Sequence, residues 1–285
     1  MNTTTVATKR RRGLLGMAPL ALTGLAIVVF WLLMTLFGPS LAPHDAAGIV
    51  DPDVFGDISW RFPLGTDYLG RDMLSRILCG ARYTVALALV AALLASGAGT
   101  VLGLVAAAAG GALDAGLSRA LDALISIPSK MFALMMVASF GSSVPLLIAT
   151  AAISFMPGAY RIARSLAVNV QAMDYVQAAR ARGERMRYIT VREILPNILR
   201  PVLADFGLRF VFTVLLLSGL SFLSLGVQPP DADWGSLVRE NIGGLSEGAP
   251  AVLMPALAIA TLTIGVNLLI DNLRGKGRQG NGKRG

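Results

Sequence analysis

The segment GTDYLGRD, residues 65–72, has the spacing in this sequence that comes nearest to a catalytic motif, because two glycines five positions apart precede a basic residue. A phosphate-binding loop, G-x-x-x-x-G-K-[ST], needs a lysine at the terminal phosphates of the nucleotide and a hydroxyl on magnesium. Arg71 and Asp72 stand at those two positions, and the Asp72 carboxylate would repel phosphate. The segment therefore does not predict nucleotide hydrolysis.

The rest of the sequence has few groups suited to catalysis or metal binding. It contains one cysteine, Cys79, and one histidine, His44, which excludes an internal disulfide and sites built from several thiolates or imidazoles. Asp231 and Asp233 lie in a loop with proline and tryptophan, where we expect a solvated turn. Because no acidic, His or Cys cluster has catalytic or metal-ligand spacing, we expect neither an enzyme nor a metal site.

The composition is that of an all-α integral membrane protein. The 285 residues are 54% hydrophobic and 15% charged, with a mean hydropathy of +0.65, which is far more apolar than an ordinary soluble domain. A membrane span needs about 20 apolar residues, and the turn residues Gly141-Ser142-Ser143 divide one overlong run in two. The predicted transmembrane helices number six, at about 17–38, 84–110, 123–140, 144–162, 205–227 and 249–270.

The basic residues are distributed unevenly about these spans. Eighteen of the 25 fall on one side, in the two tails, at Arg119 and in the stretch 161–200, and five fall on the other side. Lysine and arginine accumulate in cytoplasmic segments, so both termini and the 161–200 stretch are predicted to be cytoplasmic. The chain then consists of one transmembrane domain, 17–274, between basic tails 1–16 and 275–285. The net charge of +8 reflects this topology and does not predict nucleic-acid binding.

A cleavable secretory signal is an alternative account of the N-terminus, since a basic tail and an apolar stretch precede Ser40-Leu41-Ala42. The apolar region of such a signal has about 7–15 residues. This run is longer, and Pro43 would follow the cut. We therefore expect an uncleaved first span.

In this topology GTDYLGRD lies outside the cytoplasm, before the second span. Thr66 is expected to cap an amphipathic helix at the membrane surface, with the i,i+4 pairs Asp67–Arg71 and Asp72–Arg76. On physical grounds alone, the segment is a structural lead-in to the second span. The candidate residues are Gly65, Thr66, Asp67, Gly70, Arg71 and Asp72.

The stretch from Tyr175 to Asn197 predicts a helix, a turn and a second helix. Asp174 favours a helix start through the helix dipole, and Gly183 permits a left-handed turn. Ala178 and Ala179 keep one face thin, which suits insertion into a groove on a partner protein. A solvated basic loop beside anionic lipid headgroups is the alternative. The surrounding basic residues are Arg180, Arg182, Arg185 and Arg187.

Two spacings within the spans predict contacts between or along helices. Gly97, Gly99 and Gly103 give a G-x-x-x-G spacing that permits close helix approach, unless they only reflect the frequency of glycine in membrane helices. Asp205 and Arg209 can pair on one helix face. Both charged residues lie toward a span end and not at mid-membrane, where an ion-coupled carrier usually needs them.

The 175–197 stretch resembles the coupling loop of permease subunits in binding-protein-dependent ABC importers, whose pattern is E-A-A, three residues, Gly, nine residues, I-x-L-P. The pattern keeps its full spacing here, although Gln177 replaces the acidic residue and Glu193 stands at the isoleucine position. Residues 62–82, 220–241 and the last span are similar to dipeptide, oligopeptide and nickel permeases of the C type. The implied ATPase-coupling residues are Gln177, Ala178, Ala179, Arg180, Arg182, Gly183, Leu195 and Pro196.

This resemblance implies a type I ABC importer permease fold in a bacterial inner membrane. A second homologous permease would complete the pathway, two ATPase subunits would lie beneath it, and an extracytoplasmic solute-binding protein would deliver substrate near GTDYLGRD. The chain itself would hold no cofactor, because ATP and magnesium belong to the ATPases. The substrate stays open among dipeptides, oligopeptides, opines, glutathione and nickel. The alternative function is an ion-coupled secondary carrier that works without an ATPase.

Overall fold

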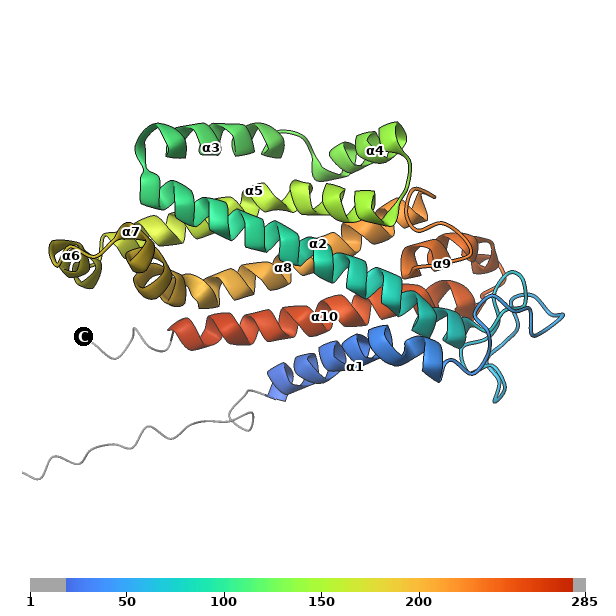
Figure 1. Cartoon of the computed structure of the whole chain (residues 1–285). Coiled ribbons are helices and arrows are strands. Elements are labelled where there is room, and N and C mark those ends of the chain that lie inside the picture. Colours follow the sequence, from blue (N-terminus) through green and yellow to red (C-terminus); the bar gives the residue numbers. More distant parts are fainter. Residues whose placement is uncertain (1–18, 279–285) are drawn as a thin grey trace, which may run out of the picture.

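The computed structural model describes residues 19–278, which form a bundle of long helices lying side by side (Figure 1). The basic tail 1–16, the first two residues of the first expected span and residues 279–285 lie outside the described residues. The elements are α1 (Pro19–Leu41), α2 (Met73–Ala109), α3 (Gly111–Ile125), α4 (Ser129–Phe140), α5 (Val144–Gln171), α6 (Asp174–Ala181), α7 (Met186–Tyr188), the π-helix η2 (Ile189–Ile194), α8 (Leu195–Phe222), α9 (Trp234–Glu240), the 3₁₀ helix η3 (Ile242–Leu245) and α10 (Pro250–Arg278).

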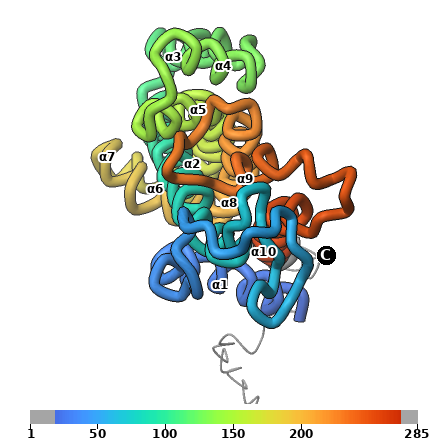
Figure 2. The backbone as a smooth tube through the Cα atoms, turned by 90° about the vertical axis from the view of Figure 1, so that its right-hand side faces the viewer, coloured from blue at the N-terminus to red at the C-terminus, as the bar shows by residue number. Residues whose placement is uncertain are grey.

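The two ends of the bundle differ in kind. One end carries the connection 42–72 together with α9, and we call it the loop end (Figure 1). The other carries α6 and α7, which project from the bundle; we call residues 174–188 the elbow and this end the elbow end. Figure 2 looks onto the loop end and shows α3 and α4 on one side of α5, with α1 on the opposite side of the bundle.

Five helices among the described residues are long and apolar enough to cross a membrane, and a bent pair adds a sixth if it counts as one span. That pair is α3 and α4, which meet at 80° where a single span at about 123–140 was expected. Pro128 explains the break, because the residue before a proline is forced out of the helical conformation. The 12 residues of α4 reach only about 18 Å, which is too short to span alone.

The other spanning helices all run further than their predicted spans, and two of them begin well before the predicted start. The second span, expected at about 84–110, is the C-terminal part of α2, whose 37 residues begin at Met73. The fifth, expected at about 205–227, belongs to an apolar helical stretch of 37 residues, Met186–Phe222, that includes the π-helix η2. At about 1.5 Å per residue, each is near 55 Å long, so each extends well beyond a hydrocarbon core of about 30 Å.

The most extensive helix contact lies between α2 and α5. A Cβ atom added at Gly99 would lie 2.5 Å from Ala159 Cβ, and one added at Gly103 would lie 2.9 Å from the Tyr160 carbonyl oxygen. Gly97, on the same helix, faces open space. The G-x-x-x-G spacing therefore marks a real helix contact, and Gly99 and Gly103 allow the two backbones to approach this closely.

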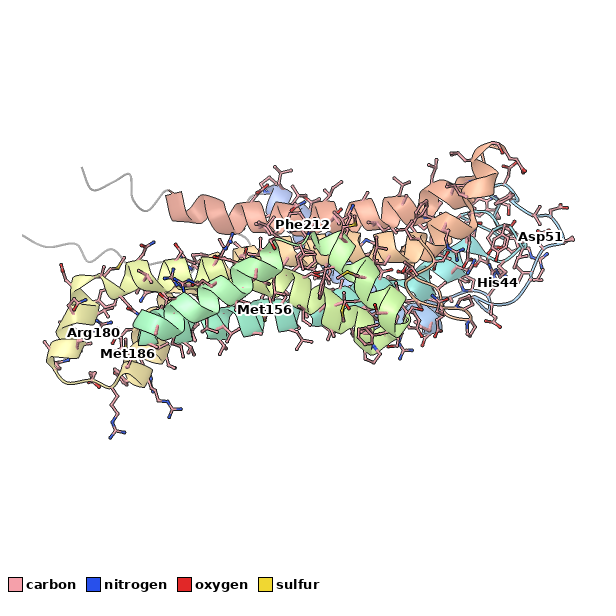
Figure 3. All side chains as sticks on the ribbon, turned by 90° about the horizontal axis from the view of Figure 1, so that it is seen from above. His44, Asp51, Met156, Arg180, Met186 and Phe212 are labelled. Carbon is pink, nitrogen blue, oxygen red and sulfur yellow. The ribbon has the colours of Figure 1, made fainter. Side chains whose placement is uncertain are left out.

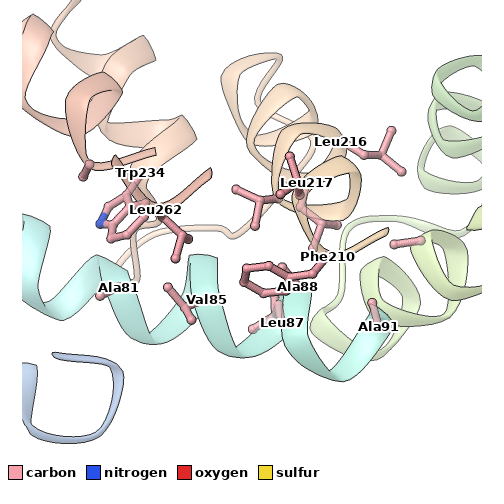
Figure 4. Packing of buried hydrophobic residues seen from close by; sticks show 14 of the residues in the cluster. Ala81, Val85, Leu87, Ala88, Ala91, Phe210, Leu216, Leu217, Trp234 and Leu262 are labelled. Atoms are coloured by element: carbon pink, nitrogen blue, oxygen red, sulfur yellow. The ribbon is translucent and has the colours of Figure 1, made fainter. Parts of the chain in front are cut away.

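The main core lies where α2, α8 and α10 meet, around Val85, Phe210 and Leu262 (Figure 4). Toward the loop end it is closed by Trp234 of α9, whose ring packs edge-on against that of Trp31 with centroids 4.6 Å apart. Trp234 is fully buried, and its indole nitrogen donates to the Ile77 carbonyl oxygen over 2.9 Å. This bond ties α9 to α2 and satisfies the polar atom of a buried indole.

The predicted pair on α8 is present. Arg209 Nε lies 2.6 Å from Asp205 Oδ2, and Arg209 Nη1 donates to the Phe155 carbonyl oxygen of α5 over 2.8 Å. A Cβ at Gly158 would lie 2.7 Å from Arg209 Nη1, so the guanidinium occupies the space that this glycine leaves. The pair therefore joins α8 to α5, and the Arg209 guanidinium is occupied by the Asp205 carboxylate and the Phe155 carbonyl oxygen.

Candidate functional site

The six lead-in residues gather around one buried carboxylate at the loop end. Asp67 is fully buried, and its Oδ1 accepts from the backbone N–H groups of Leu69 and Arg71 at 2.9 Å. Its Oδ2 accepts from Arg71 Nε at 2.7 Å and from Arg76 Nη1 at 2.5 Å. Both arginines also reach Glu240 Oε2 of α9, at 3.2 and 2.8 Å. We call Asp67, Arg71, Arg76 and Glu240 the charge cluster.

The segment 65–72 is a folded loop and not the amphipathic helix that we predicted. Thr66 does not cap a helix: it is fully buried and forms an isolated antiparallel bridge with Asp72, while its hydroxyl donates to the Asp53 carbonyl oxygen. The pair Asp67–Arg71 is present, but Arg76 pairs with Asp67 and Glu240 and not with Asp72. The helix interpretation failed because it could not include Glu240, which follows Arg76 by 164 positions.

Asp72 has the capping role that was assigned to Thr66. Its carboxylate accepts from the backbone N–H groups of Leu74 and Ser75 at the start of α2 and from the Ser75 hydroxyl. The ring of His44, at the far side of the connection, lies 3.2 Å from Asp72 Oδ2 (the labelled His44 is seen in Figure 3). Gly65 and Gly70 both have positive φ angles and form the turns on either side of Asp67. The loop therefore anchors α2.

The α9 side of this end was not recognised from the sequence. Asn241 is fully buried, and its Oδ1 accepts from the Tyr68 backbone N–H over 3.1 Å. Asp233 is also buried, contrary to the expected solvated turn, and forms a capping box with Ser236 at the start of α9. Burial raises the pKa of Asp233 above its ordinary value. The spacing Asp-x-x-Ser before an apolar residue was an available signal for this cap.

At the opposite end, the elbow has one buried face and one exposed face. Val176 and Ala179 of α6 are fully buried against Ile189, Ile194 and neighbours from α2, α5 and α8. Of the two alanines that we predicted to form a thin face, only Ala179 packs against the bundle, while Ala178 is exposed. The outward surface of the elbow consists of exposed residues: Tyr175, Gln177, Ala178, Arg180, Ala181, Arg182, Gly183, Glu184 and Arg185.

Gly183 makes the turn that the sequence predicted. Its φ angle is +81°, and a Cβ there would meet nothing within 4 Å. The Glu184 N–H donates to the Ala179 carbonyl oxygen and the Gly183 N–H to that of Arg180, which is the Schellman pattern of a helix C-terminus. Arg182 is the exposed C-cap of α6, and the labelled Arg180 and Met186 lie at the elbow end in Figure 3.

The elbow is held to the bundle by short polar bonds. Gln177 Nε2 donates to the Gln171 carbonyl oxygen over 2.8 Å, and Arg180 Nη2 to Gln171 Oε1 over 3.3 Å. Gln171 Nε2 in turn donates to the Ala107 carbonyl oxygen near the end of α2. Burial and the Glu193 carboxylate raise the pKa of Tyr175. The α6 helix is therefore bonded to Gln171 at the end of α5 and, through this residue, to α2.

Leu195 and Pro196 lie where the elbow continues into α8. Leu195 packs against the same apolar cluster as Ala179, whereas Pro196 is exposed at the second position of α8. Pro196 thus lies in the first turn of α8, and η2 joins α7 to α8 without a turn. The Leu195 N–H donates to the Thr190 carbonyl oxygen, five residues back. A proline removes one helical donor and crowds the preceding turn, and the wider π-helix accommodates both effects.

The polar side chains described at the two ends are engaged in structural contacts. Within residues 19–278 no group of three or more His, Cys, Asp or Glu side chains is placed to hold a metal ion. The buried acids at the loop end are occupied by arginines and backbone donors. One end is a cap of buried charged groups, and the other is a projecting helix joined to the bundle by two buried side chains and the hydrogen bonds to Gln171.

Comparison with known proteins gives a consistent result. Residues 99–278 match the family described as binding-protein-dependent transport system inner membrane component, and residues 18–55 match the N-terminal TM domain of oligopeptide transport permease C. The chain is 33% identical over 257 residues to a probable D,D-dipeptide transport system permease protein of Escherichia coli, covering 90% of this chain and 86% of that protein.

Two further relatives are similar over comparable lengths. A glutathione transport system permease protein of Pectobacterium atrosepticum is 32% identical over 251 residues, which cover 88% of this chain and 81% of that protein. A di/tripeptide transport system permease protein of Pseudomonas aeruginosa is 31% identical over 260 residues, 89% of this chain and 86% of that protein.

Proposed function

The chain belongs to the family of binding-protein-dependent transport system inner membrane components, and from this premise we propose that its elbow receives an ATPase and its helices form half of a translocation pathway. The family is one of ABC importer permease components and not a catalytic family. An ion-coupled carrier is not favoured. A multi-pass membrane permease of this kind works with ATPase and substrate-binding partners in general.

The observation that supports ATPase coupling is that the elbow has one face buried against the bundle and one face exposed. Its inner face is fixed by Val176 and Ala179, while its outer face, from Gln177 to Gly183, projects from the bundle. A partner that binds the exposed face can move α5 and α8 through the buried face of α6, since these helices contribute to the same apolar cluster. We propose Gln177, Ala178, Ala179, Arg180, Arg182, Gly183, Leu195 and Pro196 as the coupling residues.

We propose that the elbow end faces the cytoplasm and that the loop end faces outward in a bacterial inner membrane. Eight of the basic residues lie between Arg161 and Arg200, toward the elbow end, and such residues collect on the cytoplasmic side. The ATPases would then bind ATP and magnesium, and this chain would need no cofactor of its own.

At the loop end, we propose that Gly65, Thr66, Asp67, Gly70, Arg71 and Asp72 support a docking surface without forming it. Thr66, Asp67 and Asp72 are fully buried and cannot touch a solute-binding protein. Exposed apolar side chains lie on the connection before them, with Trp60 wholly exposed and Ile58 58% exposed. The charge cluster would hold that surface at a fixed place on α2 and α9.

A second, homologous permease and two ATPase copies would complete the transporter, with substrate passing between the two permeases. The relatives named above transport dipeptides, tripeptides or glutathione according to their names. We propose a peptide or a related small solute as the substrate of this chain. Closure of the ATPases would press on the elbow, and η2 would be the place where the helix from Met186 to Phe222 yields.

The coupling proposal is tested by co-purification of an ATPase with the tagged chain from its native membrane. Gly183→Pro removes the positive φ and the N–H bond to Arg180, and we expect it to abolish recovery of the ATPase. Gly248→Pro is a matched control, because Gly248 has φ +71°, open space and the same hydrogen-bond pattern at the loop end. Equal recovery with both variants, or none with the unaltered chain, would overturn the proposal.

A further inference from the structure

An apolar groove opens at the elbow end between α2 and the segment formed by α7 and η2. Its volume is about 650 Å³. From α2 it is lined by Val101, Leu104 and Val105, and from the other wall by Met186 and Val191. Figures 1 and 2 both show α7 beside the end of α2. The groove lies outside the coupling residues assigned above, except for Leu195 at one edge.

The groove has a single charged residue in its lining. Arg187 is exposed and belongs to the same wall as Met186. Thr190 also lines the groove, and its buried hydroxyl has no hydrogen-bond partner among residues 19–278. An apolar groove whose lining also holds one cation matches the chemistry of an anionic phospholipid, which has apolar acyl chains and a negatively charged phosphate.

The walls of the groove continue a surface that faces outward from the bundle. Along α2, an exposed apolar stripe runs through Val90, Leu94, Val101 and Val105, which are 43%, 52%, 59% and 46% exposed. The recurrence at four- and seven-residue steps places these side chains on one helix face. A chain that crosses a bilayer presents such a face to hydrocarbon, so acyl chains have direct access to the groove.

Charge favours an anionic headgroup. Between residues 174 and 193 the elbow and η2 carry five arginines against three acidic residues. Basic pockets between membrane helices attract anionic lipid headgroups, and a basic side chain near a charged surface adds to their binding. We propose that the groove binds one acyl chain of an anionic phospholipid whose phosphate pairs with Arg187. The proposal requires only that the helices span a bilayer, and it can fail or hold independently of ATPase coupling.

Such a lipid would join two parts of the molecule that otherwise meet across an open space. One wall belongs to α2, which packs on α5 through Gly99 and Gly103. The other belongs to α7 and η2, which continue from the elbow into α8. A bound acyl chain fills the space between them, so it stabilises one separation of the elbow from α2.

The test uses the permease assembled with its partner subunits in phosphatidylcholine vesicles that contain a trace of photoactivatable lipid. Phosphatidylglycerol with a photoactivatable acyl chain is compared with the matching phosphatidylcholine probe, and labelled peptides are mapped. We expect labelling of 101–109 and 186–195, with a preference for phosphatidylglycerol of about fivefold from one arginine. Arg187→Gln should remove that preference, whereas Arg192→Gln, on an exposed residue outside the groove lining, should keep it.

A second pair of variants tests the apolar part. Val105→Trp fills the groove and should remove labelling by both probes, while Val90→Trp, on the same stripe and equally exposed, should not. Even if Val105→Trp fails to assemble, Arg187→Gln still decides the question, because it alters one exposed side chain. Labelling that is equal along the stripe, a preference unchanged in Arg187→Gln, or cross-linking of the groove to the second permease in place of lipid would each overturn the proposal.

Discussion

Replacing Asp67 with asparagine is the sharpest test of how the loop end is held together. The carboxylate is fully buried and accepts four hydrogen bonds, from the side chains of Arg71 and Arg76 and from two backbone N–H groups. Asparagine keeps the shape and one acceptor oxygen but loses the charge. Its amide NH₂ group would face guanidinium donors, and Glu240 would be left as the only carboxylate for both arginines.

Removing one partner from a buried ion pair costs about 3–5 kcal/mol, because the remaining charge stays buried without compensation. A change of 1 kcal/mol moves the melting temperature of a chain this large by about 2–4 °C. We therefore expect Asp67→Asn to lower the apparent melting temperature of the purified permease by roughly 6–20 °C. The double variant with Glu240→Gln should lose more stability than the sum of the two single effects, since neither arginine then keeps a carboxylate in the charge cluster.

The lone cysteine provides the assay. Cys79 is half-buried on α2, one turn after Arg76, so a thiol-reactive fluorescent dye reports the opening of this end during a thermal ramp. Asp57→Asn is the matched control, because Asp57 is exposed and forms no ion pair within the described residues. A surface change of this kind is usually within about 0.5 kcal/mol. If Asp67→Asn melts within about 2 °C of Asp57→Asn, the charge cluster does not stabilise the loop end.

Three further predictions concern other contacts, each measured by the same thermal ramp. Gly99→Ala should destabilise by about 1–3 kcal/mol through overpacking against α5, whereas Gly97→Ala, in open space, should be neutral or stabilising; equal effects would contradict the assigned helix contact. Burial raises the pKa of Asp233, so between its ordinary pKa and the raised one the folded chain holds a proton that the unfolded chain has lost. The free energy of unfolding should therefore fall as the pH rises through this interval. Asp233→Asn should remove this pH dependence and be no less stable at neutral pH, while Asp233→Ala should lose a helix cap worth about 1 kcal/mol. Arg209→Met should be destabilising because it leaves Asp205 unpaired, and adding Asp205→Asn should recover most of that loss; no recovery would contradict the pairing.

The parts of the fold that the sequence predicted are those fixed by local pattern. Apolar runs gave most spans, Gly141 gave the turn before α5, and Gly183 gave the turn of the elbow. Each depends on residues a few positions apart. The G-x-x-x-G spacing predicted a helix contact correctly for the same reason, because small residues on one helix face permit close packing against any partner helix.

The parts that the sequence did not predict depend on residues far apart in the chain. GTDYLGRD looked helical because its charges have helical spacing, yet Asp67 pairs across to a cluster completed by Glu240 of α9. The same distance concealed Asn241, which holds the backbone of Tyr68. No spacing rule links these segments, and only the docking of α9 onto α2 brings them together. The break between α3 and α4 was missed for a different reason: the span was predicted from the mean hydropathy of an apolar run, and a single proline, Pro128, hardly changes that mean.

The two ends are held with unequal strength, and the difference agrees with the functions proposed for them. At the loop end, four charged groups, two buried caps and Trp234 hold α2 and α9 together, as a fixed docking surface would require. At the elbow end, α6 buries only Val176 and Ala179, and full burial of a valine contributes about 1.5–3 kcal/mol. If an ATPase binds the exposed face of α6 as proposed, its force would meet the least resistance at the elbow and at η2, where the helical hydrogen-bond pattern has already changed. Movement that started there would reach the loop end through α8, and the charge cluster would limit how far α9 follows.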